Sequence, residues 1–174
     1  MKIIRIALGV VIVVLAFLIF KGINEPIKFN KEKKYRYSFV IQKLKDIRTS
    51  QIAYKSVKGE FTNNYDSLLY FIKRDSFPLV KQIGNPDDTT AIVIRDTVML
   101  SVRDSLFPKE YIIDSLPFVP FTGGKSKFDM QAGEIEKGKV KVKVFEVLDT
   151  APFDKNEVLK VGSMTEPSNA GNWE

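Results

Sequence analysis

An apolar run near the N-terminus is the feature that most constrains the fold of this chain. Residues 6–20 carry no polar side chain, and Arg5 and Lys21 bound them. These fifteen residues make a helix about 23 Å long. The length reaches the roughly 30 Å of a bilayer's hydrocarbon core once Ile3 and Ile4 are added and Arg5 turns toward the head groups. We therefore predict a membrane anchor over residues 1–22, whose apolar surface is formed by Ile6, Leu8, Val11, Val14, Leu15, Phe17 and Phe20.

The residues that follow the run argue against its removal. A secretory signal peptide ends in a small-x-small cleavage site. Residues 18–23 read Leu-Ile-Phe-Lys-Gly-Ile and offer no such site. We therefore expect an uncleaved signal anchor and a single-pass protein of the inner membrane.

The absence of histidine and cysteine from the 174 residues excludes several kinds of site. A Ser-His-Asp triad, a Cys-His pair, a zinc site built on histidine and a disulfide framework all need one of these residues. A Ser-Lys dyad or a pair of carboxylates stays conceivable, but no spacing singles one out. We predict no catalytic residue, no cofactor and no metal. Beyond the anchor, the length fits one domain of about 110–140 residues with its own core.

Positive charge is concentrated just beyond the anchor. Residues 21–59 hold 11 Lys/Arg and 3 Asp/Glu, whereas residues 60–174 hold 14 and 18. Because the basicity is local, nucleic acid is not expected as a partner. A solvated helix face is the simplest reading of the cluster. The alternative is contact with anionic lipid head groups or an acidic partner, through Lys28, Lys31, Lys33, Lys34 and Arg36.

Two signals for membrane topology disagree. Lys2 and Arg5 are fewer than the cations on the far side of the run, so the positive-inside count favours a cytoplasmic domain. A short basic N-terminus followed by an apolar run instead has the form of a secretory signal anchor. We give the second signal more weight and expect a periplasmic domain.

Proline and glycine divide the next part of the chain. Pro26 predicts a helix break and a linker over residues 23–30. Asn30 is the expected N-cap of a second helix over residues 31–58, and Gly59 ends it. A strongly basic first turn would oppose the dipole of that helix. Its apolar stripe is formed by Tyr37, Val40, Ile41, Leu44, Ile47 and Tyr54.

The second half of the chain changes to a short helix and then to strands. Thr62 or Asn64 can cap a helix that carries Leu68, Leu69, Phe71 and Ile72 and ends between Arg74 and Pro78. β-Branched and alternating patterns predict strands at residues 90–94, 97–102, 111–116, 128–136, 139–147 and 158–161. The small polar residues of 162–174 predict a flexible tail, although Trp173 could dock.

Two local motifs suggest ligands only weakly. Gly123 to Ser126 resembles the end of a phosphate-binding loop, but Val119 stands where the pattern needs glycine. Asn85, Asp87 and Asp88 carry oxygen ligands suited to calcium, without the spacing of a twelve-residue loop. A solvated turn is the better interpretation of this second motif.

The order of parts resembles type IV pilins and the pseudopilins of type II secretion. The stretch that carries the resemblance runs from Ile47 through Gly59-Glu60-Phe61-Thr62 to Leu69, and the similarity covers about residues 1–75. Two features of pilin precursors are missing: Val10 follows Gly9 in place of Phe or Met, and Val14 stands in place of the glutamate. The chain also resembles uncharacterised single-pass proteins of Bacteroidetes, including its Gly-Asn-Trp-Glu ending.

The resemblance implies an α+β fold, with a long amphipathic helix packed on an antiparallel sheet over residues 31–161. It also implies a non-enzymatic structural or interaction component of a bacterial envelope assembly, with protein partners or self-association. The alternative is a membrane-tethered periplasmic module that binds a ligand or polymer. A closed pocket lined by Phe118, Phe121 and Phe128 would favour this alternative.

Overall fold

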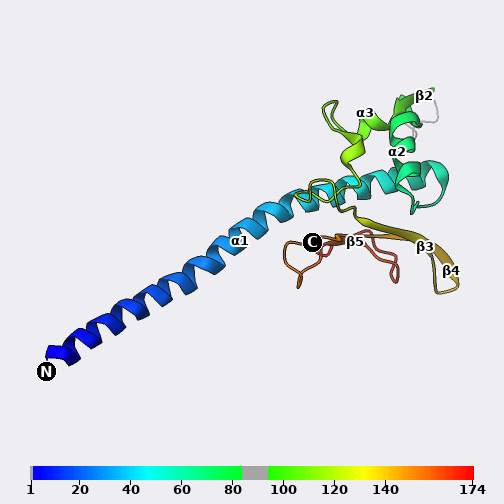
Figure 1. Cartoon of the computed structure of the whole chain (residues 1–174). Helices are drawn as coiled ribbons and strands as arrows, with labels where there is room; N and C mark the ends of the chain where they lie inside the picture. The colour runs from blue at the N-terminus through cyan, green and yellow to red at the C-terminus, as the bar shows by residue number, and fades with distance from the viewer. Residues whose placement is uncertain (1, 84–93) are drawn as a thin grey trace. The chain divides into compact units, whose positions relative to one another are not determined.

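The computed structural model describes residues 2–83 and 94–174 and divides into two units, Met1–Phe39 and Val40–Glu174 (Figure 1). It contains helices and small antiparallel sheets, so the predicted α+β class is confirmed. The candidate calcium turn at Asn85, Asp87 and Asp88 lies outside the described residues, as does most of the strand predicted at 90–94.

Helix α1, Lys2–Lys58, runs without a break through Pro26. The predicted break, and the helix start at residue 31 with Asn30 as its cap, are therefore wrong. Proline in a helix interior costs about 3 kcal/mol but removes only one of the many backbone hydrogen bonds. Local contacts support the preceding turn: Asn24 donates to the Phe20 carbonyl at 2.9 Å, and Lys21 pairs with Glu25 at 3.5 Å. Because the helix starts at Lys2, the basic cluster does not lie in a first turn.

Helix α1 ends where the sequence predicted. Gly59 has φ +83°, a left-handed conformation that favours glycine, and its N–H donates to the Lys55 carbonyl at 2.8 Å. Asn64 then caps helix α2, Tyr65–Arg74, by accepting from the Asp66 N–H at 2.7 Å.

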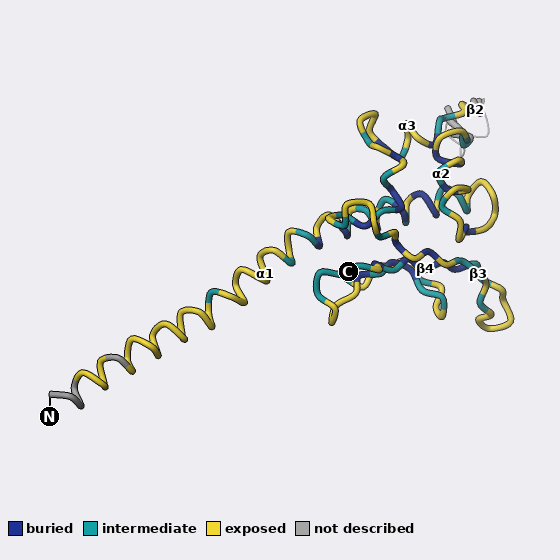
Figure 2. The backbone as a smooth tube through the Cα atoms, viewed as in Figure 1, coloured by how far each residue is buried: buried dark blue, intermediate teal, exposed yellow. Residues whose placement is uncertain are grey.

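The core of the Val40–Glu174 unit is built by the last turns of α1, by α2 and by a sheet. Val40, Leu44 and Ile47 recur at spacings of four and three residues, so they lie on one face of α1 and are buried. Figure 2 shows this change along α1, from exposed residues to buried ones. Other buried members include Leu68, Phe71 and Ile72 from α2, Phe145 and Val147 from the sheet, and Leu116.

The strands form two antiparallel sheets. Strand β1, Ser76–Ile83, pairs with β2, Ile94–Ser101. Strand β4, Val140–Leu148, lies between β3, Asp129–Lys137, and β5, Lys160–Gly162. The clearest predicted pair, joined at Gly138, is confirmed. Both Gly138 and Lys139 have positive φ, as a two-residue hairpin turn requires.

Two strand predictions need correction. The segment 111–116 contains the 3-10 helix η1, Ile113–Ser115, and its buried apolar residues, Ile113 and Leu116, are three apart, which is a helical spacing and not the alternation of a strand. The predicted strand 97–102 ends at Ser101, where the side chain caps helix α3, Val102–Leu106. Short apolar runs do not distinguish a strand from a buried helical turn.

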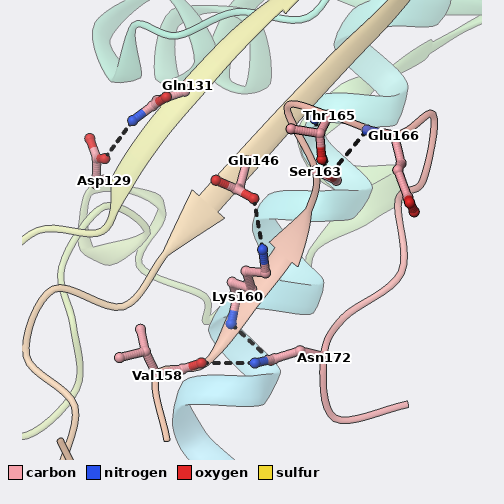
Figure 3. A network of polar contacts seen from close by, with 9 residues as sticks. All are labelled: Asp129, Gln131, Glu146, Val158, Lys160, Ser163, Thr165, Glu166 and Asn172. Carbon is pink, nitrogen blue, oxygen red and sulfur yellow. Dashed lines mark hydrogen bonds and ion pairs between the residues drawn. The ribbon is translucent and has the colours of Figure 1, made fainter. Parts of the chain in front are cut away.

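Residues 162–174, for which the sequence predicts a flexible tail, form specific contacts with the rest of the second unit. Asn172 closes two hydrogen bonds with the backbone of Lys160, each 3.0 Å long, and its amide donates to the Val158 carbonyl at 2.8 Å (Figure 3). Glu174 pairs with Arg48 of α1 at 2.7 Å. One asparagine therefore fixes the segment against β5. Composition does not reveal this contact, because the partners are backbone atoms.

Candidate functional site

The predicted anchor residues are exposed on the first unit. Ile6, Leu8, Val11, Val14, Leu15, Phe17 and Phe20 have between 51% and 69% of their surface accessible. Helix α1 is long and apolar enough to cross a membrane, by length and composition. Large apolar side chains on one continuous exposed surface mark an interaction with a membrane or another apolar partner.

The basic segment divides into two sets of residues. Arg36 pairs with Glu32 at 2.7 Å, and the Lys33 ammonium lies 5.4 Å from the centre of the Tyr37 ring. Lys28, Lys31 and Lys34 are exposed. Within the part of the chain that the structure describes, these three form no ion pair with a carboxylate. The five predicted contact residues therefore differ in how far their charges are already balanced.

Lys43 is the centre of a polar cluster that joins α1 to the segment around η1. Its Nζ donates to the Tyr111 hydroxyl at 3.0 Å, to Ser115 Oγ at 2.7 Å and to the Ser115 carbonyl at 3.3 Å. The Tyr111 hydroxyl donates to Asp46 at 2.8 Å. Burial lowers the pKa of Lys43, although Asp46 opposes the shift. Burial and the bond to Asp46 both raise the pKa of Tyr111.

Lys43 and Ser115 form the kind of serine–lysine pair that the sequence left open. In a catalytic dyad, a neutral lysine accepts the proton of the serine hydroxyl. Here Lys43 donates to three oxygens, and Ser115 Oγ itself donates to the Ile112 carbonyl at 2.7 Å. This geometry is that of a charged lysine held by oxygen acceptors. Its effect is to fasten η1 to α1.

Gln51 is a second polar residue of α1 that bonds to a distant part of its unit, and unlike the half-buried Lys43 it is fully buried. The side chain is fully buried, and its amide bonds both backbone groups of Thr62, at 2.6 Å to the carbonyl and 3.1 Å from the N–H. The same amide nitrogen lies 2.9 Å from the Met130 sulfur of β3. Gln51 thus fixes the turn after Gly59, the turn on which the resemblance to pilins depends.

An open cavity of about 490 Å³ lies beside η1. Its lining carries three cations, Lys73, Arg103 and Lys109. Lys73 already pairs with Asp114 at 2.5 Å, and Arg103 donates to the Lys109 carbonyl at 3.2 Å. The cavity therefore presents one cation that is not engaged in these contacts, beside exposed Ile112.

The other motifs weighed from the sequence do not assemble into a site. Phe128 is 2% exposed and Phe121 is 51% exposed, so Phe121 does not line a closed pocket. Gly123 and Gly124 both have positive φ in a turn, and strand β3 follows it where a phosphate-binding loop needs a helix. Among residues 2–83 and 94–174, no three carboxylates are grouped to hold a metal ion.

Sequence reasoning missed the two polar residues that hold α1 in the core. Gln51 continues the spacing of Val40, Leu44 and Ile47, so its position indicated burial while its polarity concealed it. Lys43 lies beside the same stripe, and its hydrogen-bond partners Tyr111 and Ser115 are 68 and 72 residues away in the chain. The sequence held no signal for that pairing.

Comparisons with protein-family models, curated proteins and solved structures find no match for this chain.

Proposed function

We propose that this protein is a membrane-anchored structural or interaction component of a bacterial envelope assembly, with a pilin-like arrangement and no catalytic role. One observation carries the proposal: a single unbroken helix bears the apolar, exposed run at residues 6–20 and also core residues of the Val40–Glu174 unit. The segment proposed to lie in the membrane and the core of the second unit therefore belong to one secondary-structure element. That continuity suits a permanently tethered scaffold.

The polar clusters of the second unit support a structural role for α1. Lys43 and Gln51 use their donors on backbone and side-chain oxygens of neighbouring segments. These hydrogen bonds hold α1 to the rest of its unit. Val14 stands where pilins carry a glutamate, so the proposed likeness to pilins concerns architecture and does not include assembly through that residue.

The cellular location forms part of the proposal. The apolar run favours the inner membrane, and the form of a signal anchor favours a periplasmic domain. Protease added to intact spheroplasts tests the orientation. We expect degradation of residues 40–174; protection of this unit until the membrane is lysed would instead place it in the cytoplasm.

Oligomeric state and partner capture test the function. The full chain is purified in a nonionic detergent and its mass is measured, while a tagged copy is cross-linked in native membranes. We expect a self-associated species or a defined partner. A matched variant, Val14→Lys, puts a charge in the middle of the anchor and should lose both. A strictly monomeric protein that captures nothing contradicts the proposal.

The cavity beside η1 favours a second function, a tethered module that binds an anionic ligand or polymer. Lys109, the cation of this lining that is not engaged in the contacts described above, supplies positive charge for such a ligand, whereas Glu110 and Asp114 of the same lining oppose it. Titration of the full chain with an anionic oligosaccharide, compared with Lys109→Gln, tests it. Binding that the variant weakens would favour this module over the scaffold; no binding would exclude it for this ligand class.

A further inference from the structure

Three lysines of α1 lie in a row on one side of the helix. Lys28, Lys31 and Lys34 are spaced by three residues, and each step of three turns about 60° back around the helix axis. The three side chains therefore occupy an arc of about 120°. All three are exposed, and none forms an ion pair among the described residues.

Apolar residues precede the lysines on the same side. Counted at 100° per residue, Phe20, Ile23 and Ile27 fall within about 80° of Lys31 around the axis. Ile23 and Ile27 are 55% and 58% exposed. Because α1 continues through Pro26, the apolar residues and the lysines form one continuous surface, which we call the lysine face: Phe20, Ile23, Ile27, Lys28, Lys31 and Lys34.

The helical rise places these charges near a membrane surface. If the hydrocarbon core ends at Phe20, before Lys21, Lys28 lies about 12 Å beyond it, Lys31 about 16 Å and Lys34 about 21 Å. The head-group layer is about 5–7 Å thick on each side. Lys28 reaches this layer with its side chain, and Lys31 and Lys34 lie within about two Debye lengths of it at physiological salt.

We propose that the lysine face binds the phosphate-bearing head groups of anionic lipids where α1 leaves the bilayer. The inference rests on the proposed membrane anchoring. Continuity with the anchor favours lipid over an acidic protein. The residue type agrees: Arg36, whose planar group would match a fixed carboxylate, already pairs with Glu32, whereas lysine is a mobile point charge that suits exchanging phosphates.

Lipid selectivity of the full chain tests the proposal. The protein is equilibrated with equal amounts of phosphatidylglycerol and phosphatidylcholine in mixed micelles, and native mass spectrometry counts the bound lipids. One lysine near an anionic surface is worth a factor of about five. We therefore expect at least about fivefold enrichment of phosphatidylglycerol, reduced by high salt, and near-equal binding by Lys28→Gln/Lys31→Gln/Lys34→Gln.

Two control variants locate the effect. Changing Lys137, Lys139 and Lys141 to Gln removes the same charge from the exposed β3–β4 turn and should keep the enrichment. Changing Lys28, Lys31 and Lys34 to Arg should keep it as well.

Equal binding by the wild-type protein overturns the inference, as does enrichment that persists in the Lys-to-Gln variant of the lysine face. An acidic protein captured in its place, without lipid enrichment, also overturns it. These outcomes leave anchoring intact; a chain that is soluble without detergent contradicts the proposed function itself.

Discussion

Replacing Gln51 by methionine tests how the second unit holds its helix. Methionine has nearly the length of glutamine but forms no bond to the Thr62 N–H or carbonyl, which Gln51 contacts at 3.1 and 2.6 Å. Thr62 is only 9% exposed, so water does not replace these partners freely. Each buried backbone group left unpaired costs about 1–3 kcal/mol, and the more apolar side chain returns about 1 kcal/mol. For the two groups of Thr62 we expect a net loss of about 1–5 kcal/mol, centred near 3 kcal/mol, in the free energy of unfolding.

Urea denaturation of the full chain in nonionic micelles measures this loss. Trp173 is the single tryptophan, and its indole N–H is buried, so its fluorescence reports on the second unit. At a slope of about 2 kcal/mol/M, a loss of 3 kcal/mol lowers the midpoint by about 1.5 M. Far-UV circular dichroism checks that both probes report one transition.

A matched control distinguishes the loss of the buried hydrogen bonds from the general effect of replacing glutamine by methionine in a helix. Gln42 lies exposed on the same helix and donates to Asp46 at 2.9 Å. Gln42→Met should cost no more than about 0.5 kcal/mol. If Gln51→Met costs less than about 1 kcal/mol, or no more than Gln42→Met, the reasoning about the turn after Gly59 is refuted.

Three further substitutions give expected outcomes. Gly162→Ala should cost about 2–4 kcal/mol in the same assay, because φ is +78° and a Cβ would collide with the Phe145 carbonyl; an unchanged midpoint would contradict this. Asp149→Asn should raise the free energy of unfolding at pH 7, because burial raises the pKa of Asp149 and the folded state therefore disfavours its charged form. The charged form is the one populated in the unfolded chain above about pH 3.8, so the stabilisation by Asn should disappear by about pH 3. Arg48 lowers the pKa of Glu174, so their ion pair is complete above about pH 4.5 and is lost as pH falls through the lowered value. The protection of the amides at residues 171–174, which is their exchange rate relative to the intrinsic rate at each pH, should fall over that range, and Arg48→Gln should abolish this change; protection that stays constant with pH would refute the pairing.

Local signals in the sequence predicted the elements that local contacts form. Gly59 and Asn64 mark helix ends because each satisfies backbone groups within four residues, and the hairpin at Gly138 follows from alternation around a turn. The apolar run predicted the candidate anchor for the same reason, since length and composition alone determine whether a helix can span a bilayer.

The features that could not be predicted from the sequence depend on contacts between residues far apart in the chain. Asn172 binds backbone atoms of Lys160, and Lys43 binds Ser115, a partner 72 residues away. The residue types of Lys160 and Ser115 do not indicate that either is the partner in these contacts. The wrongly predicted helix break at Pro26 has another cause. Helix propensity gives the free-energy cost of a proline inside a helix, but it does not determine whether the rest of the helix is stable enough to continue through it.

The intact mass of the protein in the membrane fraction tests the central claim most directly. We propose that the apolar run is a permanent anchor and that one helix joins it to the domain. We predict that alkaline carbonate leaves the protein in the membrane pellet, with the mass of the whole chain, 19.8 kDa. A shorter product that lacks residues 1–22 and is released into the supernatant would contradict the account.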